Sequence, residues 1–394
     1  MVGGSVSMSY GRRDFTRRLS SLRTSLASDS EAGMRGGRDC LLPRGGGGAD
    51  GLSSAVKENL AGLEPFVDEA ERLAKEAERM RYLREKARRK EQRDRERVAE
   101  DRIRDFDPKQ GGEYFTRLQF VDLTRFDLDE ESPRGPMRFT DAVYKSKDDY
   151  ELCEGINIFS VRIATSDVGF PIHVYGTVIA RDSLDKKCVY IFRRERDQCQ
   201  LINSEDESLF LTGPKRGLAL IGENYVEIDL KIKDHQGQDK ELSKGIISIP
   251  GIERRDLEQC EIESGSLATR LSTIDVMYGV VKDAVEGTIA IEVLHGDFNG
   301  KITAQTTSIL NNIVLYDSQV VGRMNGDGIG VIKLLQSIIC VYVKDMLMIV
   351  VQTSGVKTKQ TIEFTPKING REEEDMTVGV TKMRVKVAWS IMDF

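Results

Sequence analysis

Residues 170–234, FPIHVYGTVIARDSLDKKCVYIFRRERDQCQLINSEDESLFLTGPKRGLALIGENYVEIDLKIKD, decide the fold class of this 394-residue chain. Short runs rich in Val, Ile, Tyr and Phe alternate there with clusters of Asp, Gly, Ser, Asn and Pro. Such alternation is typical of a meandering antiparallel sheet. The pattern continues to Phe394 with a strand candidate roughly every ten residues, among them residues 208–212, 273–281 and 286–294. This spacing favours a sandwich or barrel over βαβ units.

The repeated strand pattern predicts a mainly β protein with an antiparallel β-sandwich body over residues 156–394. Residues 209–233 are weakly similar to residues 331–352, since both segments place a strand, a tight loop and another strand before an alternating apolar strand. Two arrangements fit this internal similarity. The body is either two stacked sandwich halves, 156–264 and 265–394, or one continuous mixed sandwich.

The chain before the body divides into three segments. Residues 1–55 are rich in Ser, Gly and Arg and poor in large apolar side chains, so we expect a disordered tail. Residues 56–107 are predicted to form a long charged helix, which Pro108 and the glycines after it end. Residues 108–155 then connect the helix to the body, with one strand near residues 117–122.

The predicted helix carries a narrow apolar stripe. Its apolar residues recur at intervals of three and four: Leu60, Leu63, Val67, Ala70, Ala74 and Ala77, continued in a second register by Leu73, Met80, Leu83 and Ala87. A stripe of this width suits a short coiled coil, and therefore self-association of two copies, or docking on the β body.

Beyond residue 87 the predicted helix is almost entirely charged. Acids precede bases by four residues, the order that supports a helix, in the pairs Glu85/Arg89, Glu91/Arg95 and Glu100/Arg104. The run KARRK at residues 86–90 resembles a nuclear signal or an RNA-binding patch. The interleaved acids favour a solvated helix face instead.

Charge is distributed unevenly along the chain, whose formal net charge is −6. Residues 1–57 hold 9 Lys and Arg against 5 Asp and Glu, and residues 58–107 hold 14 against 15. The remaining body is therefore acidic, with a net charge of −9. An acidic body disfavours broad nucleic-acid binding, which needs basic side chains to neutralise phosphates.

Composition also bears on the cellular compartment. The six cysteines occur singly and form no CxxC pair, which predicts reduced thiols and not a disulfide framework or a zinc site. Reduced thiols, together with the lack of an 18-residue apolar span or an apolar signal-peptide core, predict a cytoplasmic protein that does not bind membranes. The alternative is import into a plastid or mitochondrion, because the Arg- and Ser-rich N-terminus resembles a transit peptide.

The sequence offers no strong candidate for catalysis. Its three histidines are His173 within a strand, His235 in a turn, and His295 two residues before Asp297. The last pair is a weak acid–base or metal candidate, but hairpin turns have the same composition. Nucleophile motifs such as GxSxG and HExxH are missing, and no cysteine has a plausible histidine partner in the sequence. We expect no enzymatic activity, catalytic residue, cofactor or metal.

Two features remain as binding candidates. One is a basic spot near the GPKRG turn that suits an anion or an acidic loop of a partner: Arg193, Arg194, Arg196, Lys215 and Arg216. The ordinary explanation of such a spot is protection of an edge strand by Lys and Arg. The other is a set of aspartates at strand ends, which suit calcium only if they converge: Asp182, Asp185, Asp317 and Asp345.

Long stretches of the chain carry a family resemblance. They are residues 106–123 (FDPKQGGEYFTRLQFVDL), 159–221, 284–308 (AVEGTIAIEVLHGDFNGKITAQTTS) and the ending VKVAWSIMDF. On these, the chain resembles the grass (Poaceae) family built on the domain of unknown function 6598. The resemblance implies no activity and no catalytic residues. Some relatives carry this domain after a ribosome-inactivating (rRNA N-glycosidase) domain, which implies a link to translation control or defence.

Two hypotheses for function follow. The first is a non-enzymatic binding module for a protein partner, in plant stress or defence, with the helix as a spacer or dimer seam. The second is an accessory protein of the ribosome-inactivating type that binds the ribosome or RNA through the basic spot. Salt dependence separates them, since phosphate contacts weaken steeply as ionic strength rises.

Overall fold

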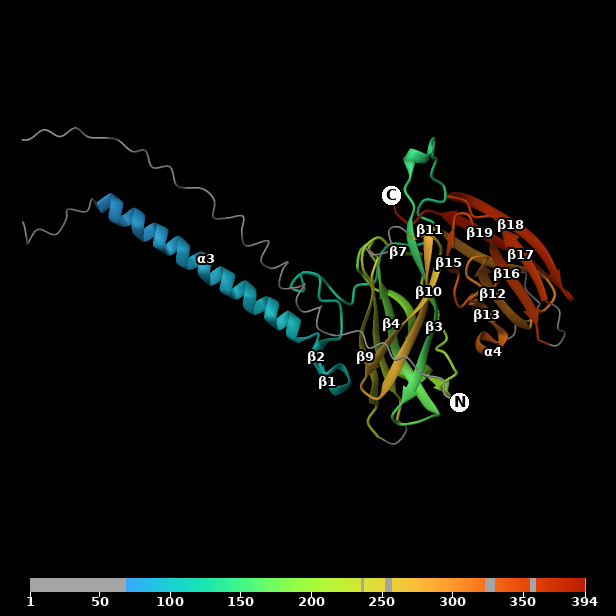
Figure 1. Ribbon diagram of the computed structural model, residues 1–394, viewed down its shortest axis with the longest axis horizontal. Coiled ribbons are helices and arrows are strands. Elements are labelled where there is room, and N and C mark those ends of the chain that lie inside the picture. The colour runs from blue at the N-terminus through green and yellow to red at the C-terminus, as the bar shows by residue number, and fades with distance from the viewer. Residues whose placement is uncertain (1–68, 235–236, 252–256, 323–329, 355–358, 394) are drawn as a thin grey trace, which may run out of the picture. The chain divides into compact units, whose positions relative to one another are not determined.

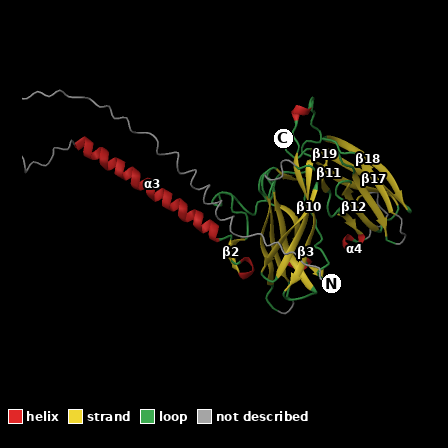
Figure 2. Ribbon diagram, viewed as in Figure 1, coloured by secondary structure: helices red, strands yellow, loops and turns green. Residues whose placement is uncertain are grey.

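The computed structural model of the chain describes residues 69–234, 237–251, 257–322, 330–354 and 359–393. The described part is mainly β, with antiparallel sheets and one long N-terminal helix, as the sequence predicts (Figure 1, Figure 2). Residues 79–394 form one compact unit. The predicted disordered tail, the helix before residue 69, Cys40 and His235 lie outside the described residues.

Helix α3 (Glu69–Asp101) carries charged pairs along its exposed surface. The predicted pairs Glu85–Arg89 and Glu91–Arg95 both form, the latter with Nη2 at 2.6 Å from Oε1. Each such pair contributes about 0.3–0.5 kcal/mol to a helix. The third predicted pair, Glu100–Arg104, also forms at 3.6 Å, although Arg104 lies beyond the end of α3.

A small hairpin that the sequence pattern does not predict follows α3. Strand β1 (Arg104–Asp107) pairs antiparallel with β2 (Gly112–Phe115). The 3-10 turn η1 (Pro108–Gln110) joins them and is capped by Gly111 at φ 78°, a left-handed conformation that favours glycine. The strand expected near residues 117–122 is wrong, because the backbone there bonds to side chains of the body and not to another strand: the Leu118 N–H donates to Glu227 Oε1 (2.8 Å).

Among the described residues, three sheets build the body. The largest has eight strands in the order β18-β19-β11-β3-β7, with β10, β14 and β15 also paired to β11. These strands are β3 (Cys153–Ser166), β7 (Leu218–Leu220), β10 (Glu261–Thr269), β11 (Ser272–His295), β14 (Gly330–Val331), β15 (Ile338–Tyr342), β18 (Asn369–Val378) and β19 (Thr381–Ser390).

The two other sheets have matching strand orders. One is β5-β4-β8-β9 with β6 also paired to β4, formed by β4 (Ile172–Arg181), β5 (Val189–Arg194), β6 (Gln200–Ile202), β8 (Asn224–Ile232) and β9 (Lys240–Ile249). The other is β13-β12-β16-β17, formed by β12 (Gly300–Thr306), β13 (Ile313–Asp317), β16 (Leu347–Thr353) and β17 (Lys359–Phe364). A one-turn helix, α4 (Ser318–Val321), follows β13.

The strand pairing shows one topology used twice. The order β5-β4-β8-β9 corresponds strand by strand to β13-β12-β16-β17. In the large sheet, the strands of the first repeat pair in the order β10-β11-β3-β7. The strands of the second repeat pair in the corresponding order β18-β19-β11-β15. The internal similarity between residues 209–233 and 331–352 covers β7–β8 and β15–β16, which hold equivalent positions in the two repeats. Strand β11 belongs to both repeats, and Figure 1 shows them on its two sides.

An irregularity in β11 lets this one strand serve two hydrophobic cores. In the first half of β11, even-numbered residues such as Ile274 lie in the hydrophobic core of the first repeat. In the second half, odd-numbered residues such as Ile289 lie in the core of the second repeat. The register with β3 shifts between Val281 and Ala284, where β11 has one residue more than its partner. One additional residue reverses the alternation of side chains along a strand. A smaller apolar cluster that includes Val281 and Ala284 lies at this point.

Three differences from the predicted strands are local. The two strands expected at 273–281 and 286–294 are one, because the polar pair Lys282-Asp283 lies in a bulge and not in a turn. The strand expected at 208–212 forms only an isolated bridge, between Arg162 and Ser208. Strand β18, with the sequence NGREEEDMTV, escapes prediction because an edge strand exposed to water carries few apolar side chains.

Candidate functional site

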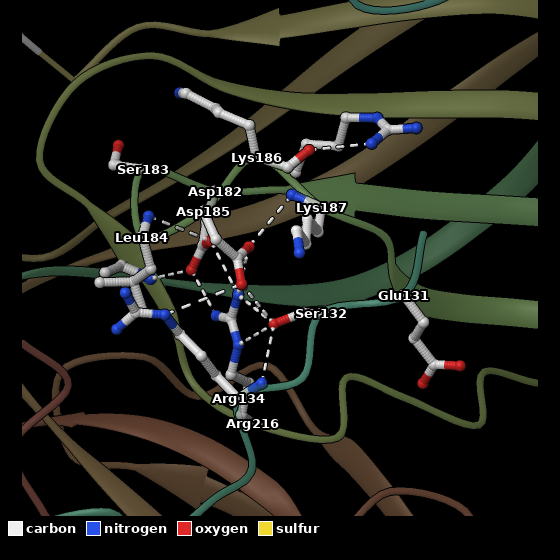
Figure 3. Close-up of polar contacts among 12 residues, drawn as sticks. Glu131, Ser132, Arg134, Asp182, Ser183, Leu184, Asp185, Lys186, Lys187 and Arg216 are labelled. Atoms are coloured by element: carbon white, nitrogen blue, oxygen red, sulfur yellow. Dashed lines mark hydrogen bonds and ion pairs between the residues drawn. The ribbon is translucent and has the colours of Figure 1, made fainter. Parts of the chain in front are cut away.

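Arg216, from the predicted basic spot, is only 1% exposed and lies at the centre of a polar cluster (Figure 3). Its Nη2 donates to Asp182 Oδ1 (2.9 Å), to Ser132 Oγ (3.3 Å) and to Asp185 Oδ1 (3.4 Å). The two aspartates follow β4 in the chain, and Ser132 belongs to the segment before β3. We call these four residues the Arg216 cluster; it ties the connecting segment to the body.

The charges of the Arg216 cluster compensate one another inside the protein. Burial by itself would lower the pKa of Arg216, but the hydrogen bond and charge of Asp182 and the charge of Asp185 outweigh it and raise that pKa. The second carboxylate is also fixed, since Asp185 Oδ2 accepts from Ser132 Oγ (2.7 Å). A guanidinium held in this way stabilises the fold and is not presented to a ligand.

Two further residues of the basic spot are ion-paired near the surface. Lys215 Nζ lies 2.7 Å from Glu131 Oε1. Arg196 Nε lies 2.7 Å from Asp239 Oδ2, and that carboxylate also accepts from a tyrosine hydroxyl. The structure therefore neutralises much of the charge that the sequence predicts for this spot.

The last two residues of the spot lie over aromatic rings. The guanidinium of Arg193 is 4.7 Å from the centre of the Tyr190 ring, and it also lies 3.9 Å from Glu195. The guanidinium of Arg194 is 5.9 Å from the Phe210 ring. Arg193 and Arg194 keep part of their surface exposed, but with Arg216 buried the five residues do not converge on one site.

The structure contains a second buried ion network that the sequence pattern does not predict. Arg181 is fully buried, and its Nε and Nη2 donate to Glu227 Oε1 (2.6 Å) and Oε2 (2.9 Å). Arg117 Nε donates to the same Glu227 (3.2 Å) and Arg117 Nη1 to Asp129 (2.8 Å). An arginine at the end of an otherwise apolar strand is the one sequence signal that points to it.

The cleft beside this network is small. It has a volume of about 170 Å³ and is lined by residues that include Arg117, Tyr190, Glu227 and Lys244. Sites for cofactors and drug-sized ligands usually have volumes of roughly 300–1,000 Å³. This cleft is therefore too small for a molecule of that size.

The histidines are placed differently from one another. His295 and Asp297 are both exposed at the end of β11. His173 lies in β4, with its Nδ1 at 3.8 Å from Cys199 Sγ. The expectation that no cysteine has a histidine partner is therefore wrong, because β6 returns antiparallel to β4 and brings Cys199 next to His173.

The strand-end aspartates do not gather at one place. Asp182 and Asp185 bind Arg216. Asp317 caps α4 by accepting from a backbone N–H, and it lies 3.6 Å from a lysine. Asp345 accepts from Thr307 Oγ1 at 2.9 Å. Within the part of the chain that the structure describes, no three His, Cys, Asp or Glu side chains lie close enough to hold one metal ion.

Helix α3 presents a cationic segment, residues 79–93 (RMRYLREKARRKEQR), with 8 Lys and Arg against 2 Glu. Arg89 pairs with Glu85, and Glu91 pairs with Arg95. The other cations of the segment have no ion-pair partner among the described residues: Arg79, Arg81, Arg84, Lys86, Arg88, Lys90 and Arg93. No described helix is both long and apolar enough to cross a bilayer.

The apolar stripe of α3 is exposed as well. Leu73, Met80 and Leu83 are 57%, 47% and 45% exposed, and no residue of α3 is buried. Cations flank this stripe, because Arg79 and Lys86 lie four and three residues from Leu83 and therefore share its side of the helix. Helix α3 is thus a basic amphipathic helix with an exposed apolar face.

Similarity to proteins of known structure is weak. No curated protein matches the sequence. Among solved structures, a pair of C2 domains from Extended-Synaptotagmin 2 matches with 9% identity and a TM-score of 0.22, covering 64% of this chain and 96% of that one. Human GIVD cytosolic phospholipase A2 in complex with methyl gamma-linolenyl fluorophosphonate matches with 9% identity and a TM-score of 0.20, over 61% of this chain and 33% of that one.

A family match covers most of the β body. The sequence matches the family described as "Domain of unknown function (DUF6598)" over residues 155–387, from the first residues of β3 to the second half of β19. This span includes both repeats and the shared strand β11. The chain belongs to the DUF6598 family.

Proposed function

We propose that this chain is a non-enzymatic interaction protein, and that α3 binds a partner protein with an apolar groove rimmed by acids. The observation that carries the proposal is the combined surface of α3: exposed Leu73, Met80 and Leu83 flanked by cations without ion-pair partners among the described residues. Amphipathic helices bind such grooves through apolar anchors at helical spacing.

The two parts of this surface favour a protein over RNA. Phosphate contacts would use the cationic segment, but they would leave Leu73, Met80 and Leu83 in water. A groove with an acidic rim buries these apolar side chains and pairs the cations at the same time. Burial of a leucine or methionine side chain contributes about 1.5–3 kcal/mol, so three such anchors can decide affinity.

The alternative, binding of the ribosome or RNA through the basic spot, has less support. Arg216 is buried, and Lys215 and Arg196 are ion-paired. Only Arg193 and Arg194 of that spot keep a guanidinium over an aromatic ring, a geometry that also suits base stacking. A setting in plant stress or defence follows from the family resemblance alone.

A capture experiment with the full chain as bait tests the proposal. Four baits are compared in plant extract with and without RNase treatment: wild type, the apolar variant L73Q/M80Q/L83Q, the cationic variant R79Q/K86Q/K90Q/R93Q, and the control R72Q/K75Q/R95Q/R97Q. The control removes the same number of charges from α3, but from cations that already have acidic partners. Glutamine keeps a high helix propensity, and circular dichroism confirms helix content.

The proposal requires a protein that wild type and control retain and that both the apolar and cationic variants lose. Loss with the cationic variant alone, together with RNase-sensitive capture, would instead favour RNA. Binding only to a second copy of this chain, measured by sedimentation, would identify the apolar stripe as a dimer seam. Equal capture by all four baits would exclude α3 as the recognition element.

A further inference from the structure

A cysteine and a histidine meet on the outer face of the sheet β5-β4-β8-β9. Strand β4 pairs with β6 so that His173 lies opposite Leu201 and Val174 opposite Gln200. Val174 and Gln200 are buried, so the alternate residues His173 and Cys199 point to the outer side. There His173 Nδ1 lies 3.8 Å from Cys199 Sγ, and both residues are half-buried.

A cation lies next to this pair. Arg194 Nη1 donates to the carbonyl oxygen of Gln198, the residue before Cys199 (3.0 Å). Burial lowers the pKa of Arg194, and the negative charge of the Cys199 thiolate acts in the opposite direction, so the two groups lie within electrostatic range. A thiol beside a histidine and an arginine is in the environment typical of reactive cysteines.

Two other cations at this end of the sheet are ion-paired. Arg196 pairs with Asp239 (2.7 Å), and Lys233 pairs with Asp197 (3.8 Å). Arg194 has no ion-pair partner among the described residues. No carboxylate of the described residues therefore neutralises its guanidinium, which can interact with a thiolate at Cys199.

Small molecules can reach His173. It lines an open cleft of about 340 Å³ together with residues that include Ile172, Lys233, Asp234 and Lys240. Water and a molecule as small as hydrogen peroxide fit easily in a space of this volume.

The other described cysteines are in a different environment. Burial raises the pKa of Cys153 and Cys340 to about 12, and it also raises the pKa of Cys188 and Cys260. These thiols remain protonated at neutral pH, and the thiolate is the nucleophilic form. Cys260 is half-buried like Cys199, so it is a matched internal control.

We propose that Cys199 is a peroxide-sensitive thiol whose proton is accepted by His173. The thiol proton passes to Nδ1 of His173, and the thiolate sulfur attacks one oxygen of hydrogen peroxide. An S–O bond forms and the O–O bond breaks; the leaving hydroxide takes the proton from the imidazolium and becomes water. Sulfur is oxidised by two electrons to a sulfenic acid and the peroxide is reduced. This inference is independent of the function proposed for α3.

Peptide mapping of the full chain tests the inference. Protein is treated with hydrogen peroxide at pH 7 in the presence of dimedone, which traps sulfenic acids, and the label on each cysteine is measured with time. We expect Cys199 to react at least about tenfold faster than Cys260, and H173N to slow Cys199 about tenfold, because the thiol then lacks the base that accepts its proton. The control H295N removes an exposed histidine and should change nothing.

Two results would overturn the inference: Cys199 reacting no faster than Cys260, or Cys199 reacting equally fast in H173N and wild type. A second measurement applies if H173N does not fold. In wild type at pH 7, iodoacetamide should alkylate Cys199 at least about tenfold faster than Cys260, because alkylation also requires the thiolate. Equal rates would contradict the proposal.

Discussion

The buried guanidinium of Arg216 depends on two carboxylates, and loss of one partner leaves uncompensated charge in the interior. Asp182 is fully buried, and Arg216 Nη2 lies 2.9 Å from its Oδ1. Breaking a buried pair by removing one member typically destabilises a protein by about 3–5 kcal/mol, whereas a surface pair contributes about 0–1 kcal/mol. Adjacent residues of this chain allow the two cases to be compared.

Arg216→Met is expected to lower the free energy of unfolding by about 3–5 kcal/mol, because the buried Asp182 then keeps its charge without its cation. Lys215→Met is the control; its ion pair with Glu131 is at the surface, so a change below about 1 kcal/mol is expected. Urea denaturation followed by circular dichroism measures both. Equal effects of the two substitutions would contradict the structural role given to Arg216.

Glu286 is a second buried ionisable residue. It is 5% exposed, and its Oε2 and Oε1 accept from the backbone N–H groups of Gly217 (2.6 Å) and Met137 (2.7 Å). Burial raises the pKa of Glu286 above its usual value of 4.5, although these hydrogen bonds oppose the rise. Between the usual and the raised value the folded state binds more protons than the unfolded state, so stability falls as pH rises.

Glu286→Gln carries no charge at any pH and is expected to remove this pH dependence. Relative to Glu286→Gln, the wild type should lose stability as the pH rises above about 4.5, the usual pKa of this carboxyl group. Unfolding in urea at several pH values measures the difference. Glu374→Gln, on the exposed edge strand β18, is the control and should run parallel to wild type. Parallel curves for Glu286→Gln as well would show that this carboxyl does not titrate differently on folding.

At the scale of single elements, β11 is the most constrained strand. It pairs with β3 and β19, and its side chains enter the first core before the bulge and the second core after it. The additional residue at the bulge sets which side chains face each core. Strand length at this point therefore matters more than the identity of the side chain.

Deletion of Lys282 is expected to destabilise the protein by more than about 4 kcal/mol, because every side chain of β11 beyond the bulge would reverse its face. Substitution of the half-buried Lys282 by alanine keeps the length of the strand and should change stability by less than about 1 kcal/mol. Thermal unfolding of both variants measures the contrast. A stable deletion variant would show that the register of β11 can slip without loss of either core.

At the scale of the whole molecule, the two repeats share β11 and cannot unfold independently without breaking it. The first core contains the fully buried Ile191, and the second contains Trp389, the one tryptophan of the chain. Fluorescence of Trp389 therefore reports on the second repeat, whereas circular dichroism reports on both.

Ile191→Ala is expected to destabilise the protein by about 2–5 kcal/mol, because it leaves a cavity in the first core. Coupling through β11 predicts that the urea midpoint measured by Trp389 fluorescence falls as far as the midpoint measured by circular dichroism. Val351→Ala, in the second core, is the control that must shift the fluorescence midpoint in either case. An unchanged fluorescence midpoint in Ile191→Ala would show that the repeats unfold separately.

Local pattern was enough for the fold class. The alternation of apolar and polar residues predicts most strands of the body, and acid-first pairs predict α3, because both signals depend on neighbours within a few residues. The alternation does not predict β18, because a strand on an exposed edge needs few apolar side chains. It also does not predict the bulge of β11, because the charged pair Lys282-Asp283 has the composition of a turn.

The sequence by itself determined that this chain is an antiparallel β protein with a charged helix, because strand and helix periodicity are properties of adjacent residues. Only the tertiary structure decided which charges and reactive groups meet. Arg216 is buried against Asp182, and Cys199 reaches His173, because chain segments distant in sequence pair across the sheets. Whether a charge is solvated or compensated depends on those distant partners, and no local pattern encodes them.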